Sequence, residues 1–178
     1  LALYFVEVFL SYPKDLLHEK KLIMKKYEKT TGIKLDRRDK ILAYFEEKKI
    51  NPDLKLKVGP HYYYNDYNLK LFPFSGISYT QIFDCNEGGF YSTYKNDRYG
   101  FQNPDYEWDN KIIDFVLVGD SFTHGACVNP PDDITGNLRS LFKNKSFLNL
   151  GFGGNGPLTS YATLREYLDK KTVKNIFF

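Results

Sequence analysis

The last third of the chain alternates between short apolar runs and helical patterns, and this alternation limits the possible folds most. Apolar runs lie at 112–118, 146–150 and 173–178, and helical patterns at 132–142 and 157–171. The first run, IIDFVLV, is interrupted only by Asp114, as expected for a strand that is buried on both faces. Strand–helix–strand units wind into parallel sheets, so the pattern predicts an α/β domain over residues 111–178.

Residues 13–110 are expected to form an N-terminal extension in two parts. Residues 14–50 have apolar side chains at helical spacing, with Asp36 or Asp39 as the N-cap of a second helix. Residues 61–108 are rich in aromatic side chains and broken by Pro and Gly, which favours short strands and turns. The aromatic side chains fit either a surface for stacking sugars or bases, or the core of a small β-rich module.

The opening stretch LALYFVEVFL has Glu7 as its single charge. It is about half of the roughly 20 residues that span a bilayer. We expect residues 1–12 to be the end of a membrane anchor or signal segment that starts upstream; a packed apolar helix is the alternative. Residues 11–57 carry an excess of Lys and Arg, which indicates either a position near anionic lipid or solvated helices. The net charge of +3 does not indicate a nucleic-acid partner.

Two glycine-containing turns follow the first two predicted strands, at Gly119–Ser121 and at Gly151–Gly156. Ligands of parallel sheets bind beyond the carboxyl ends of the strands, so both turns belong to one edge. Ser121 at the start of a helix presents a hydroxyl and a backbone N–H that suit a nucleophile and an oxyanion donor. A glycine N–H of the second turn supplies a second donor. The alternative is that Ser121 only caps the helix.

A second interpretation of the glycines is open. Gly151, Gly153 and Gly156 match G-x-G-x-x-G between a strand and a helix, which is the dinucleotide-binding fingerprint. That fingerprint normally follows the first strand of the sheet, whereas here it follows the second.

The pair VLVGDSFTHG and LNLGFGGNGP resembles the SGNH (GDSL) hydrolases, and CNEGGFYSTYKNDRYGFQNP (85–104) resembles the lead-in of a bacterial, often membrane-anchored subgroup. The resemblance covers residues 85–178. It implies a flavodoxin-like three-layer α/β/α sheet, here ending after the third strand, and a membrane-anchored serine esterase or acyl transferase of the cell envelope. The side of the membrane stays open, because the basic residues after the anchor favour the inside. The implied substrate is an ester or an acylated carbohydrate, with no metal or organic cofactor.

The resemblance assigns Ser121 as the nucleophile and Gly154 as the oxyanion glycine. It also implies an Asn in a Gly-x-Asn-Asp loop and a late Asp-x-x-His, both expected beyond Phe178, so the chain as given is expected to be inactive. His124 is expected at the rim of the site as a substrate contact, not as the base.

A non-catalytic module that binds an envelope polymer is the alternative function. We hypothesise that Cys85 and Cys127 pair outside the cytoplasm and tie the extension to the rim.

Overall fold

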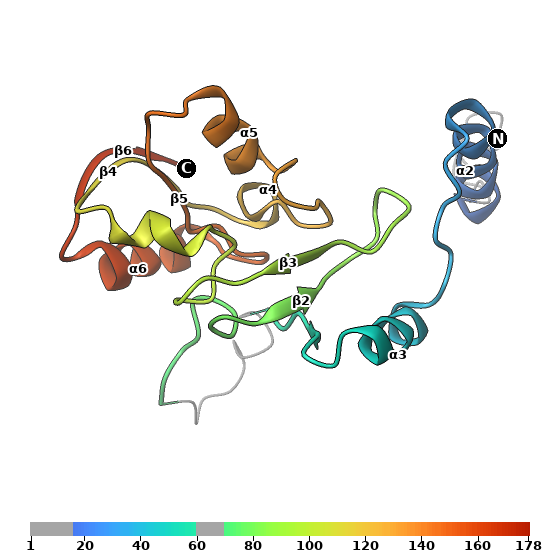
Figure 1. The fold of residues 1–178 in the computed structure, drawn as a ribbon, viewed down its shortest axis with the longest axis horizontal. Helices are drawn as coiled ribbons and strands as arrows, with labels where there is room; N and C mark the ends of the chain where they lie inside the picture. The colour runs from blue at the N-terminus through green and yellow to red at the C-terminus, as the bar shows by residue number, and fades with distance from the viewer. Residues whose placement is uncertain (1–15, 60–69) are drawn as a thin grey trace, which may run out of the picture. The chain divides into compact units, whose positions relative to one another are not determined.

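The computed structural model describes residues 16–59 and 70–178, with side chains from residue 21 onward (Figure 1). The chain divides into two compact units, Leu1–Arg37 and Arg38–Phe178. The first unit contains α2 (Leu16–Thr31), which is followed by Gly32 in the left-handed conformation at φ 71°. In the described part of the chain, no helix is both long and apolar enough to span a membrane. The anchor expected at residues 1–12 lies outside the described residues.

The second unit begins with α3 (Lys40–Ile50) and a small mixed sheet. Asp39 is the N-cap of α3, as one of the two expected caps, and accepts hydrogen bonds from the N–H groups of Ile41 and Leu42. The sheet consists of β1 (Lys55–Leu56), β2 (Gln81–Phe83) and β3 (Thr93–Lys95). β1 pairs parallel with β2, and β2 pairs antiparallel with β3. The short strands expected within residues 61–108 are therefore confirmed for β2 and β3; residues 60–69 are not described.

The predicted strand–helix alternation is confirmed in the last third of the chain. In chain order the elements are η2 (Asp105–Asp109), β4 (Ile112–Leu117), α4 (Ser121–His124), α5 (Ile134–Leu141), β5 (Phe147–Asn149), α6 (Pro157–Leu168) and β6 (Thr172–Phe177). The three strands form a parallel sheet in the order β5-β4-β6. The chain is thus an α/β protein, and Figure 1 shows α5 and α6 on either side of the strands.

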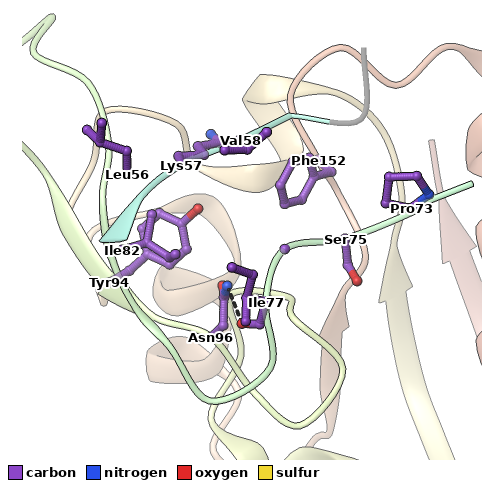
Figure 2. Close-up of a pocket in the computed structure, with 11 residues that line it drawn as sticks. Leu56, Lys57, Val58, Pro73, Ser75, Ile77, Ile82, Tyr94, Asn96 and Phe152 are labelled. Carbon is purple, nitrogen blue, oxygen red and sulfur yellow. Dashed lines mark hydrogen bonds between the residues drawn. The ribbon is translucent and has the colours of Figure 1, made fainter. Parts of the chain in front are cut away.

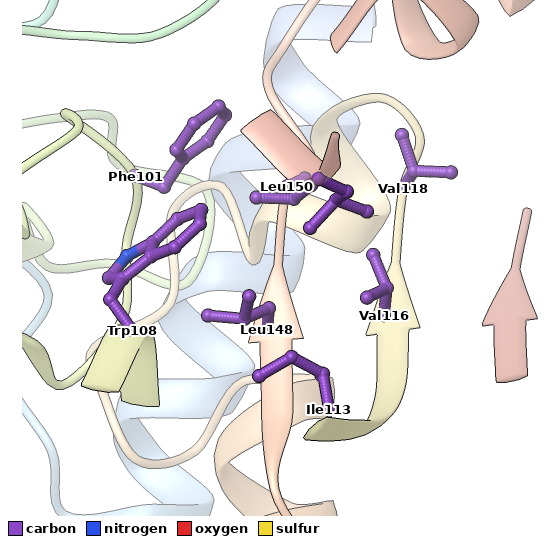
Figure 3. Packing of buried hydrophobic residues seen from close by; sticks show 8 residues of the cluster. Phe101, Trp108, Ile113, Val116, Val118, Leu148 and Leu150 are labelled. Atoms are coloured by element: carbon purple, nitrogen blue, oxygen red, sulfur yellow. The ribbon is translucent and has the colours of Figure 1, made fainter. Parts of the chain in front are cut away.

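The core of the parallel sheet recruits residues that precede it in the chain. Phe101 and Trp108 pack in one buried cluster with Ile113, Val116 and Leu148 (Figure 3). Packing is therefore continuous across the domain boundary expected near residue 110, because the sheet needs these large side chains to complete its core. Four described aromatic side chains of residues 61–108 are buried, namely Phe83, Tyr94, Phe101 and Trp108, whereas Phe72, Tyr79, Phe90, Tyr99 and Tyr106 are exposed, so the core accounts for only part of them.

A buried polar cluster, the Asp97 cluster (Asp97, Asn103, Glu107, Trp108 and Arg139), fixes this segment to the sheet. The Asp97 carboxylate accepts hydrogen bonds from the Trp108 indole N–H at 2.7 Å and the Asn103 amide at 2.9 Å. Asn103 also bonds the backbone of Asn149 in β5. Arg139 of α5 donates to Asn103 at 2.6 Å and pairs with Glu107 at 3.3 Å. The cluster thereby joins the lead-in segment, α5 and β5.

Candidate active site

Ser121 is the first residue of α4, and it is not the cap of that helix. The N-cap is Asp120, whose carboxylate accepts a hydrogen bond from the N–H of Phe122 at 3.0 Å. The Ser121 side chain is partly exposed, and its hydroxyl makes no hydrogen bond within residues 16–59 and 70–178. The capping role is therefore taken by the neighbouring aspartate, which leaves the serine hydroxyl available for another use.

The turn after β5 packs directly against α4. The N–H of Phe152 donates to the carbonyl of Gly119 at 3.0 Å. The Asn149 side chain donates to the carbonyl of Thr123 at 2.7 Å and accepts from the N–H of Gly151 at 2.9 Å. A side chain at Gly151 has no room, because its Cβ would lie 2.6 Å from the His124 nitrogen. The two turns that the sequence places at one sheet edge are therefore in contact.

Gly153, next along this turn, adjoins Ser121. A Cβ built on Gly153 would lie 3.9 Å from the Ser121 Cβ and 3.8 Å from the Lys57 Nζ. Gly154, the expected oxyanion glycine, is exposed and left-handed at φ 90°, a conformation that favours glycine. Ser121 and the segment that contains Gly154 thus meet at the same edge of the parallel sheet.

Three ionisable side chains, Lys57, Asp84 and His124, contact one another in a buried row beneath this edge. Together with Tyr94 we call them the Lys57 cluster. Lys57, which follows β1, donates to the Asp84 carboxylate at 2.9 Å and contacts the His124 Nδ1 at 2.9 Å. Tyr94 of β3 meets the His124 ring edge to face, and Phe152 stacks on that ring. The pKa of Lys57 is lowered, because burial outweighs the opposing effect of the Asp84 carboxylate.

His124 is not a rim residue, and that expectation is wrong. Its side chain is 1% exposed, because Tyr94, Phe152 and Lys57 enclose it. Burial lowers the pKa of His124 well below its usual value, and the adjacent Lys57 charge lowers it further. An ammonium group has only donors, so the neutral imidazole accepts at Nδ1 and carries its proton on Nε2. The buried Nε2 has no partner among the described residues.

Cys85 and Cys127 form a disulfide, as hypothesised from the sequence. Cys85 follows Asp84, and Cys127 lies three residues after His124. The covalent bond and the Asp84–Lys57–His124 contacts therefore join the same two segments, the exit of β2 and the loop after α4. The small mixed sheet is fastened to the helix that carries Ser121.

Lys57, Asp84 and Tyr94 have no distinctive signal in the sequence. Lys57 and Asp84 are 27 residues apart, and Lys57 and His124 are 67 residues apart. The one local hint is a single lysine between Leu56 and Val58, in a segment whose other lysines look like ordinary surface charges. Only the pairing of β1 with β2 brings these side chains together.

The described residues define an α/β protein with a serine at the edge of a parallel sheet, beside a glycine-rich turn. Within those residues, no group of three or more His, Cys, Asp or Glu side chains is placed to hold a metal ion. Comparisons of the chain with protein-family models, with curated proteins and with solved structures find no match. Its function is therefore inferred from its own residues and geometry.

Proposed function

We propose that the protein is an SGNH-type serine esterase or acyl transferase with Ser121 as its nucleophile. The observation that carries this proposal is the contact between the helix that starts at Ser121 and the glycine turn after β5. A hydroxyl at a helix start, next to a turn without side chains, leaves room for an ester carbonyl and for backbone donors to its oxygen.

The proposed reaction has two stages. The Ser121 Oγ attacks the ester carbonyl while a general base takes its proton, and the N–H groups of Ser121 and Gly154 stabilise the oxyanion. The C–O bond of the ester then breaks, the alcohol leaves with the proton from the base, and an acyl-enzyme remains. Water or an acceptor hydroxyl releases the acyl group. His124 does not serve as the base, because it is enclosed and its Nδ1 faces the Lys57 ammonium.

The strand order supports the flavodoxin-like assignment over the dinucleotide-binding alternative. The first strand, β4, lies between the second and the third, β5 and β6. This is the start of the flavodoxin-like order 2-1-3-4-5, whereas the dinucleotide fold places the third strand beside the second. The glycines of the 151–156 turn then serve close packing on α4 and room near Ser121, instead of pyrophosphate binding.

The disulfide supports a location outside the cytoplasm. Disulfides persist in oxidising compartments and are rare in a reducing cytosol. We therefore propose an envelope protein that acts on esters of a carbohydrate, lipid or small molecule, held at the membrane through its N-terminal segment.

Hydrolysis of p-nitrophenyl acetate by the natural full-length protein tests the enzymatic proposal. Ser121→Ala is expected to lower kcat by about three orders of magnitude or more, since the nucleophile is lost. Ser140→Ala, on the exposed side of α5, is the matched control and should retain full activity. A fluorophosphonate probe should label Ser121 in the wild type. Activity that survives Ser121→Ala, with no labelling of that residue, would overturn the proposal and favour a binding module.

A further inference from the structure

A cavity of ≈ 240 Å³ lies between the small mixed sheet and the turn after β5 (Figure 2). Its walls within the described residues are mostly apolar. They are formed by Leu56, Val58, Pro73, Ile77, Ile82 and Phe152, with Lys57, Ser75, Gly76, Tyr94 and Asn96 as the other lining residues. A water fills about 30 Å³ of liquid volume, so the cavity holds on the order of eight waters, or a ligand of similar heavy-atom count.

Two polar lining side chains, Lys57 and Tyr94, offer donors to a ligand, whereas Asn96 has an acceptor oxygen, Oδ1, without a partner among the described residues. The Lys57 ammonium has three N–H groups, of which Asp84 and His124 take two, while the Phe152 ring lies 5.5 Å from the nitrogen. Tyr94 is 3% exposed, and its hydroxyl, which points into the cavity in Figure 2, has no hydrogen-bond partner in the described part of the chain. Because Tyr94 lines the cavity and its hydroxyl has no partner among the described residues, the hydroxyl can donate to an acceptor atom of a ligand there.

The polar end of the cavity adjoins the nucleophile. Gly153 directly follows the lining residue Phe152, and a Cβ built on it would contact both the Lys57 Nζ and the Ser121 Cβ. The contacts of a Cβ at this position, 3.8 and 3.9 Å, are ordinary van der Waals distances. A Cβ at Gly153 therefore fits without strain, and a larger side chain there would narrow the route between the cavity and the serine.

We propose that this cavity is a binding pocket for a short, linear acyl chain of about six to eight carbons. The carboxylate of the free acid lies at Lys57 and Tyr94, on the Ser121 side, and the chain extends along Leu56, Ile77 and Ile82. The assignment as the acyl pocket of an enzyme rests on the proposed function of Ser121. The binding of a carboxylate to the cavity does not, so the two can fail separately.

The first experiment measures binding of butanoate, octanoate and dodecanoate to the full-length protein by titration calorimetry. Octanoate is expected to bind most tightly, since butanoate buries fewer methylenes and dodecanoate exceeds the cavity. Tyr94→Phe removes one hydrogen bond to a charged group and is expected to weaken octanoate binding about tenfold. Tyr161→Phe, an exposed position on α6, is the matched control and should bind as the wild type does. Equal affinity in Tyr94→Phe and wild type, or no binding of any acid, overturns the pocket.

The second experiment compares kcat/KM for p-nitrophenyl acetate with kcat/KM for p-nitrophenyl octanoate. The wild type is expected to prefer the octanoyl ester, by about fourfold for each methylene that the cavity buries. Gly153→Leu is expected to reduce that preference at least tenfold while the melting temperature is kept; Gly156→Leu, at a position open to solvent, is the control. If Gly153→Leu keeps the wild-type preference for the octanoyl ester, the proposed route from the cavity to Ser121 is wrong. Octanoate binding without any Ser121-dependent hydrolysis overturns the enzymatic proposal and leaves the carboxylate pocket in place.

Discussion

The Asp97 cluster and the Lys57 cluster are both buried and charged, but they differ in how completely their hydrogen bonds are satisfied. The Asp97 carboxylate accepts from two side chains and from the N–H groups of Tyr99 and Phe101. In the Lys57 cluster the buried Nε2 of His124 has no partner in the described part of the chain. The Tyr94 hydroxyl, on a residue that lines the cavity, has none there either. Burial raises the pKa of Asp97, and its four donors oppose that shift.

The difference separates a structural role from a functional one. A fully satisfied buried network rigidifies its surroundings and gains nothing from a ligand. A buried donor without a partner costs free energy unless something binds it, so it marks a site. The first cluster holds the lead-in segment on the sheet. Lys57 and Tyr94 of the second line a cavity, and Lys57 and Ser121 both adjoin Gly153. The predictions below test whether satisfaction of hydrogen bonds distinguishes the two.

The largest effect on stability is expected from Asp97→Ala. The change leaves the Trp108 indole, the Asn103 amide and two backbone N–H groups without their acceptor in a buried site. The free energy of unfolding, from urea denaturation, should fall by about 4 kcal/mol. Asp109→Ala is the control, because its ion pair with Arg98 is exposed, and it should cost less than about 1 kcal/mol. If Asp97→Ala lowered the free energy of unfolding as little as the control does, the Asp97 cluster would have no structural role.

The second largest effect is expected from the disulfide that flanks the Lys57 cluster. Cys85 and Cys127 are separated by 42 residues, and closing such a loop typically contributes about 3 kcal/mol. The double variant Cys85→Ala/Cys127→Ala should therefore unfold at lower urea, and a reductant should destabilise the wild type but not the variant. Two free thiols in unreduced, denatured wild type would show that the bond is absent.

The parallel sheet could be predicted from sequence because its signals are local. A strand buried on both faces is an apolar run, and an acidic residue next to a helical pattern, here Asp133, caps α5 through the N–H of Gly136. The serine and glycine turns could be placed at one edge because parallel strands end together. These inferences need only residues that are close together in the chain.

The Lys57 cluster and the cavity could not be predicted, since their residues meet only through tertiary structure. β1 pairs with β2 across a connection of more than twenty residues, and neither strand has a distinctive pattern. His124 was expected at the rim because it lies one turn after Ser121 on the same short helix, while the resemblance places the base in a distant loop. Tyr94 and Phe152, from β3 and from the turn after β5, enclose it. Sequence periodicity on α4 carries no information about those two rings.

A smaller effect, and one that depends on pH, is expected from His124. Its pKa is lowered in the folded state, so unfolding takes up a proton below the usual value of about 6.5. Stability from this group is therefore fully present above that pH and is lost as the pH falls, by up to about 1.4 kcal/mol per unit. Tyr94, Lys57 and, behind Lys57, Asp84 are the titratable groups around it.

His124→Gln keeps an acceptor for Lys57 but does not titrate, so it should lose less stability than the wild type between pH 7 and pH 5. Urea denaturation of both proteins at each pH gives the two slopes. Their difference isolates the histidine, because the remaining acidic groups titrate in both proteins. Parallel slopes would mean that His124 is protonated or exposed in the folded protein, and the enclosed, unsatisfied site would not exist.

The smallest effect is the most direct comparison of satisfied and unsatisfied groups, because it uses one chemical change at two buried tyrosines. The Tyr44 hydroxyl donates to the carbonyl of Leu54 at 3.2 Å and accepts from Lys48 at 2.9 Å. Tyr44→Phe should therefore cost about 1 kcal/mol. Tyr94→Phe removes a hydroxyl that has no partner and should change the free energy of unfolding by less than about 0.5 kcal/mol in the absence of ligand.

Saturating octanoate should make the free energy of unfolding of the wild type higher than that of Tyr94→Phe, because only the wild-type hydroxyl then gains an acceptor. A cost for Tyr94→Phe equal to that for Tyr44→Phe without ligand would mean that the Tyr94 hydroxyl is already satisfied, and the distinction between the two clusters would fail at its most exact point.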